Sequence, residues 1–291
     1  MYKSALAIRE RLAKANPQAY EPDLAVSYNN FGNLYYATQR FQESEAMYKS
    51  ALAIYERLAK ANPQAYELDL ADSYYNLANL YSDTQRFQES EAMYKSALAI
   101  RERLAKANPQ AYEPALADSY NNLAILYKNT QWFQESEEMH KSAIAIRERL
   151  AKANPQAYES VLADSYNNLA NLYSDTQRFQ ESEEMYKSAL AIRERLAKAN
   201  PQAYEPDLAG SYNNLAIVYY GTERIQECEE MFKSALAIYE HLAEDDPQVY
   251  GSDLARTYSN LAIVYNETQR FAESEEMANA AAEIRERLGI E

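Results

Sequence analysis

The sequence is poor in the residue types from which catalytic and metal sites are usually built. Its 291 residues include one cysteine, two histidines and five glycines. The single cysteine, Cys228, excludes a disulfide framework within the chain and fits a reducing, cytoplasmic location. His140 and His241 lie far apart, and no Cys/His metal spacing, glycine-rich phosphate loop or nucleophile elbow occurs. We therefore expect a protein that is not an enzyme, with no catalytic residue, no metal ion and no cofactor.

Two further absences limit the partners. No apolar run approaches the ~20 residues that a membrane-spanning helix needs, and no signal peptide is visible at the start. The net charge is −15, with 29 lysines and arginines against 44 aspartates and glutamates. Such a surface lacks the basic clusters that nucleic acids and anionic membranes require. The acidic excess favours neutral or basic partners.

What the sequence does contain is one unit copied many times. An Asn-Pro pair, replaced by Asp-Pro in the last copy, recurs with a period of 46 residues. A fixed period between roughly 20 and 50 residues is typical of a solenoid, in which each unit contacts only its neighbours. The prolines of these pairs are Pro17, Pro63, Pro109, Pro155, Pro201 and Pro247.

Within one unit the apolar residues have helical spacing. From Tyr74 to Tyr81 they follow the i, i+3, i+4, i+7 pattern, which predicts a first helix over about 69–83. A second apolar stripe predicts a second helix over about 87–107. Only residues 84–86 separate the two, so the helices are expected to form an antiparallel hairpin.

The Asn-Pro pair is predicted to end the second helix, because a residue before proline disfavours the helical conformation. The following Gln-Ala-Tyr-Glu segment is predicted to be a connector between hairpins. Pro22, Pro114 and Pro206 come just after it, and a first helical position tolerates proline because its N–H is unpaired anyway. We therefore expect the next first helix to begin at these prolines.

Several positions of the unit at 70–109 match a known repeat pattern. They are Tyr74, Leu77, Ala78, Tyr81, Ser90, Tyr94 and Ala97. Their spacing resembles the tetratricopeptide repeat, and the words YNNLANLY and SALAI are similar to the long repeat of kinesin light chains. The resemblance implies an all-α fold, a right-handed superhelical solenoid of about 13 antiparallel helices. It also implies a non-catalytic scaffold that binds proteins or peptides in a concave groove.

The repeat extends over the whole chain and predicts a single domain, residues 1–291. Residues 1–15 match the interior of a second helix, and we interpret this start as that of a fragment of a longer array. Glu291 is expected to be the natural end. The first helix would leave an apolar end uncovered, which predicts self-association at the N-terminal end. The repeats are expected at about 22–62, 68–108, 114–154, 160–200, 206–246 and 252–289.

The copies differ mainly on one face of the first helix, which looks into the concave groove in the family that the repeat resembles. A uniform scaffold with a varied groove suits a surface that reads a ligand. Basic residues are few and unclustered there, which predicts no carboxylate clamp for acidic C-terminal tails. The three varied sets are Asn33, Asn79, Ile125, Asn171, Ile217 and Ile263; Tyr36, Ser82, Lys128, Ser174, Tyr220 and Asn266; and Val26, Asp72, Asp118, Asp164, Gly210 and Arg256.

The same face carries one constant residue type. Asparagine in a helix interior is disfavoured by roughly 0.6 kcal/mol relative to alanine, so its repetition calls for a reason. A primary amide both donates and accepts, and can pair with the backbone of an extended peptide. The alternative is a ladder of asparagines that bond one repeat to the next without a ligand. The constant residues are Asn30, Asn76, Asn122, Asn168, Asn214 and Asn260.

We therefore predict that the chain binds a protein or an extended peptide in this groove. Two other hypotheses stay open. The chain can be the sensor or scaffold arm of a larger signalling or enzyme protein, or a self-assembling structural solenoid, which a strict monomer at high concentration would exclude. The candidate binding residues are Asn30, Asn33, Asn76, Asn79, Asn122, Asn168, Asn171, Asn214, Asn260, Asp72, Asp118 and Asp164.

Overall fold

The computed structural model describes residues 2–290 and contains no strand in that range. It divides into two compact units, residues 1–146 (unit 1) and 147–291 (unit 2), and each is described by itself. The predicted single domain across both units stays a prediction. Glu291, the expected natural end, lies outside the described residues.

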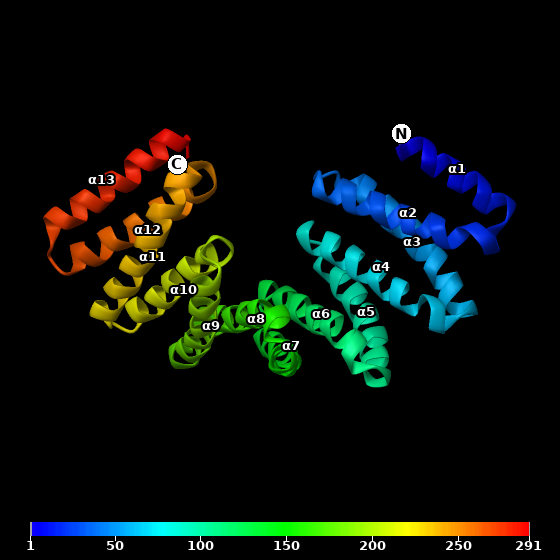
Figure 1. The fold of residues 1–291 in the computed structure, drawn as a ribbon, viewed down its shortest axis with the longest axis horizontal. Helices are drawn as coiled ribbons and strands as arrows, with labels where there is room; N and C mark the ends of the chain where they lie inside the picture. The colour runs from blue at the N-terminus through cyan, green and yellow to red at the C-terminus, as the bar shows by residue number, and fades with distance from the viewer. Residues whose placement is uncertain (1, 291) are drawn as a thin grey trace. The chain divides into compact units, whose positions relative to one another are not determined.

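The described chain consists of thirteen α-helices joined by very short turns, which confirms the all-α prediction (Figure 1). Consecutive helices pack against each other from α1 to α6 in unit 1 and from α8 to α13 in unit 2. The first helices of the repeats, or A helices, are α2 (Pro17–Ala37), α4 (Pro63–Asp83), α6 (Pro109–Asn129), α8 (Pro155–Asp175), α10 (Pro201–Gly221) and α12 (Pro247–Glu267). The second, or B helices, are α1 (Tyr2–Ala15), α3 (Phe41–Ala61), α5 (Phe87–Ala107), α7 (Phe133–Ala153), α9 (Phe179–Ala199), α11 (Ile225–Asp245) and α13 (Phe271–Leu288).

The predicted connector between hairpins is wrong, because the Gln-Ala-Tyr-Glu segment is helical. Each A helix begins at the proline of the Asn-Pro pair, and a single residue separates it from the preceding B helix. At Asn62 the side-chain oxygen accepts a hydrogen bond from the Ala65 N–H at 3.3 Å, and Pro63 occupies the first helical position. The pair therefore ends one helix and also caps the next. Pro22 lies inside α2, rather than at its start.

The turn between the A and B helices has the same geometry in every repeat. After α4, the Gln85 N–H donates to the Ser82 carbonyl at 3.0 Å and the Arg86 N–H to the Tyr81 carbonyl at 2.7 Å. These two bonds define a Schellman motif, whose pivotal residue must be left-handed. Gln85 has φ of 60°, in the region where a side chain is strained. The equivalent left-handed residues are Gln39, Gln131, Gln177, Glu223 and Gln269.

In each of these turns the side chain of the residue after the left-handed one contacts a tyrosine ring of the A helix. The Arg86 guanidinium lies 4.1 Å from the centre of the Tyr81 ring. At the third repeat tryptophan replaces arginine, and Trp132 stacks on Tyr127 with ring centres 5.6 Å apart. Trp132 thus makes the side-chain contact that usually accompanies this motif.

Each hairpin is held together by a buried side chain near the start of its B helix. Ser90 is fully buried and its hydroxyl donates to the Ala78 carbonyl of α4 at 2.8 Å. The same bond joins Ser44 to Gly32 and Ser182 to Ala170. Cys228 takes this position in α11 and is also fully buried, so it packs inside the hairpin as the serines do.

Tyrosine–glutamate hydrogen bonds join each A helix to the B helix before it. The Tyr74 hydroxyl donates to Glu56 at 2.9 Å, and the Tyr212 hydroxyl to Glu194 at 2.8 Å. Burial, followed by the hydrogen bond to glutamate, raises the pKa of Tyr74 to about 12, and the same two causes raise that of Tyr212 to about 12. The equivalent pairs are Tyr28–Glu10, Tyr120–Glu102, Tyr166–Glu148 and Tyr258–Glu240.

Replacing the left-handed Gln85 by glycine is expected to stabilise the protein. Glycine adopts positive φ without the steric cost of a Cβ, so Gln85→Gly should raise the free energy of unfolding by about 1 kcal/mol. Urea unfolding followed by circular dichroism measures this change. The matched control is Ser82→Gly, inside α4, where glycine should lower the stability by about 1 kcal/mol. Equal effects of both variants would contradict the strained turn.

The tyrosine–glutamate pairs predict a loss of stability at alkaline pH. The folded pKa of Tyr74 is raised from 10.0 to about 12, so the folded state binds the phenol proton more tightly than the unfolded chain. The contribution is fully present below pH 10 and is lost as the pH rises toward 12. Urea midpoints across this window should fall with pH, and they should fall less steeply in Tyr74→Phe. An unchanged slope in that variant would contradict the assignment.

Candidate functional site

The A helices of one unit lie beside one another and share a surface, which we call the A-helix face of that unit. In unit 1 the Asn29 amide donates to the Ser73 hydroxyl of the next A helix at 3.0 Å. In unit 2 the Asn213 amide donates to the Thr257 hydroxyl at 2.9 Å, and Tyr220 donates to Glu267. These bonds bring the candidate residues of successive repeats onto one surface within each unit.

Two of the constant asparagines bond to the preceding A helix. The side-chain amide of Asn122 donates to the Tyr75 hydroxyl at 2.6 Å and to the side-chain oxygen of Asn79 at 3.3 Å. The side-chain amide of Asn214 donates to the side-chain oxygen of Asn167 at 3.1 Å. At these repeats the asparagines form the ladder that the sequence offered as the alternative to ligand binding.

Three other constant asparagines make no such bond. Among the described residues, no hydrogen bond links the side chains of Asn30, Asn76 or Asn260 to the protein. The buried side-chain oxygens of Asn29 and Asn213, the residues to which Asn76 and Asn260 would bond in a continued ladder, have no partner. Asn168 also has an interaction partner. The constant position is therefore divided between structural amides and amides that a ligand can use.

In the first varied set on this face, the asparagines accept hydrogen bonds from tyrosines of the B helix. Tyr48 donates to Asn33 at 2.6 Å, and Tyr186 donates to Asn171. Burial raises the pKa of Tyr186, so its hydroxyl stays protonated and available to donate. The copies change in pairs: asparagine occurs with tyrosine in Asn33–Tyr48, Asn79–Tyr94 and Asn171–Tyr186, and isoleucine with other residues in Ile125–His140, Ile217–Phe232 and Ile263–Ala278.

The aspartates of another varied set are ion-pair partners of buried arginines. Arg101 is 4% exposed and its guanidinium donates to Asp72 at 2.6 Å. The same guanidinium donates to the Ser119 hydroxyl of the next A helix at 2.6 Å. Arg193 donates to Asp164 at 2.6 Å in the same way. Asp118 has a further contact of its own. Asp72 and Asp164 thus offset buried charge inside the repeat.

The B-helix partners were missed by sequence reasoning, although the copies carry a signal for them. Each aspartate lies 29 residues before its arginine. At this spacing Val26 is followed by Tyr55 and Gly210 by Tyr239, so the aspartate is absent where the arginine is absent. Comparing the two helices of each copy, rather than one helix across copies, would have found the pairs.

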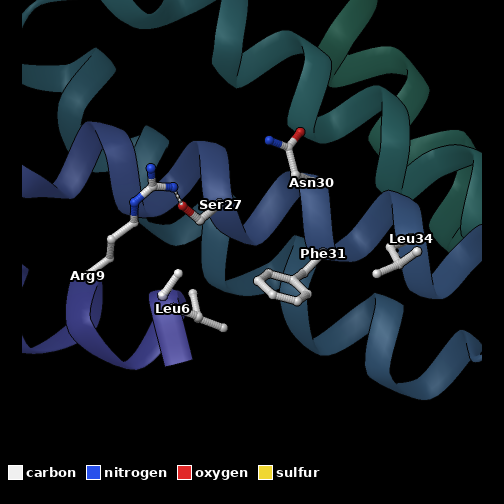
Figure 2. A pocket seen from close by; sticks show the side chains of 7 residues that line it. Leu6, Arg9, Ser27, Asn30, Phe31 and Leu34 are labelled. Carbon is white, nitrogen blue, oxygen red and sulfur yellow. Dashed lines mark hydrogen bonds between the residues drawn. The ribbon is translucent and has the colours of Figure 1, made fainter. Parts of the chain in front are cut away.

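Two of the hollows among the described residues include positions of the A-helix face. In unit 1 a pocket of about 460 Å³ opens between α1 and α2, with Leu6 and Arg9 from α1 and Phe31 and Leu34 from α2 (Figure 2). Leu34 is 50% exposed, unlike the buried leucines at this position in α4, α6 and α8. This pocket is the apolar N-terminal end for which self-association was predicted, and self-association stays a prediction. In unit 2 a smaller hollow of about 70 Å³ lies between α10 and α12.

The described residues contain neither a metal-binding cluster nor a membrane-spanning helix. No group of three His, Cys, Asp or Glu side chains among them is placed to hold a metal ion. None of the described helices is long and apolar enough to span a membrane.

Helix pairs that repeat along the chain, each stacked on the next within its unit, define an α-solenoid. Such solenoids provide surfaces for protein interaction. Two tetratricopeptide repeat models match the chain, one at residues 24–64, 70–110 and 116–156, the other at 161–241 and 207–287. The chain belongs to the tetratricopeptide repeat family, whose solenoids generally serve as non-catalytic scaffolds.

Solved structures support this assignment. BtubC (BKLC) from P. vanneervenii is 26% identical, with a TM-score of 0.69 over 86% of this chain and 92% of that chain. A kinesin light chain-like protein from Podosopora anserina with nearly identical TPR-like repeats is 19% identical, with a TM-score of 0.58 over 76% and 97%. The apo form of RapI is 14% identical, with a TM-score of 0.61 over 91% and 98%. No curated protein sequence matches the chain at a significant level.

The pairing of Asn171 with Tyr186 predicts a strong coupling between these residues. Asn171→Ile should leave the buried tyrosine hydroxyl without its acceptor, and Tyr186→Phe should remove the donor; each should cost about 1–2 kcal/mol. The double variant reproduces the Ile217–Phe232 pair of the next repeat. It should be more stable than the sum of the single effects allows, by about 1 kcal/mol. Urea unfolding of the four proteins measures the coupling, and additive effects would contradict it.

Proposed function

We propose that the chain is a non-catalytic scaffold that binds an extended peptide along its A-helix faces. Membership of the tetratricopeptide repeat family supports protein interaction as the general role. The observation that supports the finer proposal is the set of amides without a protein partner at Asn30, Asn76 and Asn260. Asn30 is exposed, and Asn76 and Asn260 are half-buried. An amide without a protein partner in a helix interior has little structural benefit, and it can pair with a peptide backbone.

The spacing of these amides fits an extended ligand. Asn30 and Asn76 lie at the same position of α2 and α4, which are neighbouring A helices of unit 1. Packed helices lie roughly 8–10 Å apart, and an extended chain rises ~3.3 Å per residue. One asparagine per repeat can therefore hold about every third peptide residue through its backbone, without reading its side chain.

The acidic candidates contribute less to partner choice than the sequence indicated. Asp72 and Asp164 are neutralised by Arg101 and Arg193. A preference for neutral or basic partners then rests on the net charge of −15 alone, and it stays a prediction. The roles of scaffold arm in a larger protein and of self-assembling solenoid also stay predictions.

The two kinds of asparagine give the proposal a sharp test. The triple variant Asn30→Ala, Asn76→Ala, Asn260→Ala should keep its stability, or gain some, because alanine favours the helix. It should bind peptides selected by the wild type from a displayed random library at least 10-fold more weakly, since each amide contributes about 1 kcal/mol. Fluorescence anisotropy of the selected peptides measures the affinity.

The matched control is Asn122→Ala with Asn214→Ala. These amides bond to Tyr75 and Asn167, so their loss should lower the stability by about 1 kcal/mol each. It should affect peptide affinity less than the triple variant does. If the wild type selects no peptide, or if the triple variant loses stability and keeps its affinity, the asparagines are structural and the proposal is wrong.

A further inference from the structure

In the fifth and sixth repeats, both face positions that bond to B-helix side chains in other repeats carry different residues. They are Ile217 and Gly210 in the fifth repeat, and Ile263 and Arg256 in the sixth. We propose that the A-helix face of α10 and α12 is an anchoring site for a partner peptide that presents an aliphatic side chain and a carboxylate about three residues apart. This inference rests on the proposed function and names the partner chemistry at one place on that surface. Two independent observations carry it.

The first observation is an apolar hollow between the two A helices. Ile217 and Ile263 take the place of the asparagines that pair with tyrosine elsewhere, and they are 50% and 51% exposed. Together with Tyr220 and Asn260 they line the hollow of about 70 Å³, and Phe232 forms part of its floor. Exposed isoleucine costs stability in water, whereas the Asn–Tyr pair of the first, second and fourth repeats does not. The hollow has room for the end of one branched aliphatic side chain.

The second observation is a local excess of positive charge beside this hollow. Arg256 takes the place of the aspartate that offsets the B-helix arginine in the second and fourth repeats. The B-helix residue of the sixth repeat is still an arginine, Arg285, which donates to the Ser259 hydroxyl one turn after Arg256 at 3.0 Å. Asp253 accepts from Arg256 at 2.6 Å. Among the described residues Arg285 has no carboxylate partner, and Asp253 pairs with Arg256 alone. A partner's carboxylate would supply the missing negative charge.

The neighbouring residues leave room for that carboxylate and determine at which end of the site it binds. At the equivalent position of α10 stands Gly210, and a Cβ added there would meet only the Tyr239 hydroxyl, at 3.7 Å. At the other end of the hollow, Glu267 on α12 would repel a carboxylate. The acidic residue of the peptide therefore binds at Arg256, and the aliphatic residue at Ile263.

The distance between the two positions sets the spacing in the peptide. Arg256 and Ile263 lie seven residues apart on α12, and a helix rises 1.5 Å per residue, which gives about 10 Å. An extended chain covers this distance in about three residues. The preferred motif is thus an aliphatic residue and an aspartate or glutamate at positions i and i+3, in one order or the other.

Two variants remove one half of the site each, and both copy pairs that other repeats already contain. Ile217→Asn with Phe232→Tyr creates the Asn–Tyr pair of the first, second and fourth repeats. Arg256→Asp creates with Arg285 the Asp–Arg pair of the second and fourth repeats. Because these pairs are stable elsewhere in the chain, both variants are expected to fold, as circular dichroism and urea unfolding would verify.

The experiment is a selection from a displayed library of random peptides against the wild type and both variants, followed by anisotropy with synthetic peptides. The wild type should enrich peptides with an aliphatic and an acidic residue three apart. The Ile217→Asn, Phe232→Tyr variant should bind them about 10-fold more weakly and retain the acidic preference. Arg256→Asp should lose the acidic preference, accept lysine in its place and retain the aliphatic one.

The outcomes separate this inference from the proposed function. If the wild type selects peptides that depend on Asn30 and Asn76, but both unit 2 variants bind them unchanged, the anchoring site is wrong and the proposed function stands. If the wild type enriches no peptide, both are wrong. A matched reverse variant, Asn171→Ile with Tyr186→Phe, should leave the affinity for the selected peptides unchanged; a rise equal to the loss in unit 2 would show that any exposed isoleucine suffices, which overturns the assignment to α10 and α12.

Discussion

Hydrogen bonds between the two helices of each repeat constrain which residues can occupy the A-helix face. Asn171 accepts from the buried Tyr186, and Asp72 accepts from the buried Arg101. A change on the face alone would leave a buried polar group unpaired, at a cost of about 1–3 kcal/mol. A face position and its B-helix partner therefore tend to differ together, as in the change from Asn171–Tyr186 to Ile217–Phe232, and Arg256 with Arg285 is an exception. Variation on the A-helix face therefore reflects internal packing, and it is not by itself evidence of ligand binding.

The fold was largely predictable because the same unit occurs six times in the sequence. Apolar periodicity identified the hairpin and the bounds of the B helices, such as Phe87–Ala107. The start of the A helix was mispredicted because an Asn-Pro pair can both end one helix and begin the next. Proline disfavours a helix at the residue before it, and it also favours a helix that begins with it. Asn62 satisfies both rules at once, since its backbone ends α3 and its side chain caps α4.

For the candidate site, the sequence predicted which residues share the A-helix face, and it did not predict the contacts of each side chain. Asn76 and Asn122 are the same residue at the same position of consecutive repeats. They differ because Asn122 reaches Tyr75 on the preceding helix, whereas Asn29, the equivalent of Tyr75 one repeat earlier, donates to Ser73 instead. Side-chain geometry of this kind depends on contacts across 44 to 47 residues of sequence, which a pattern within one unit does not contain.

Net charge is a poor guide to what such a surface binds. The chain carries −15, yet the aspartates on its A-helix faces are largely committed to arginines, as in Asp72–Arg101 and Asp164–Arg193. The charge that a partner would meet is the part that this internal pairing leaves unbalanced. In the sixth repeat the pairing is incomplete in the opposite sense, since Arg256 pairs with Asp253 whereas Arg285 donates only to the uncharged Ser259 hydroxyl. Fields from surface charges are screened within about 8–10 Å at physiological ionic strength, so a bound peptide responds to this local balance more than to the total.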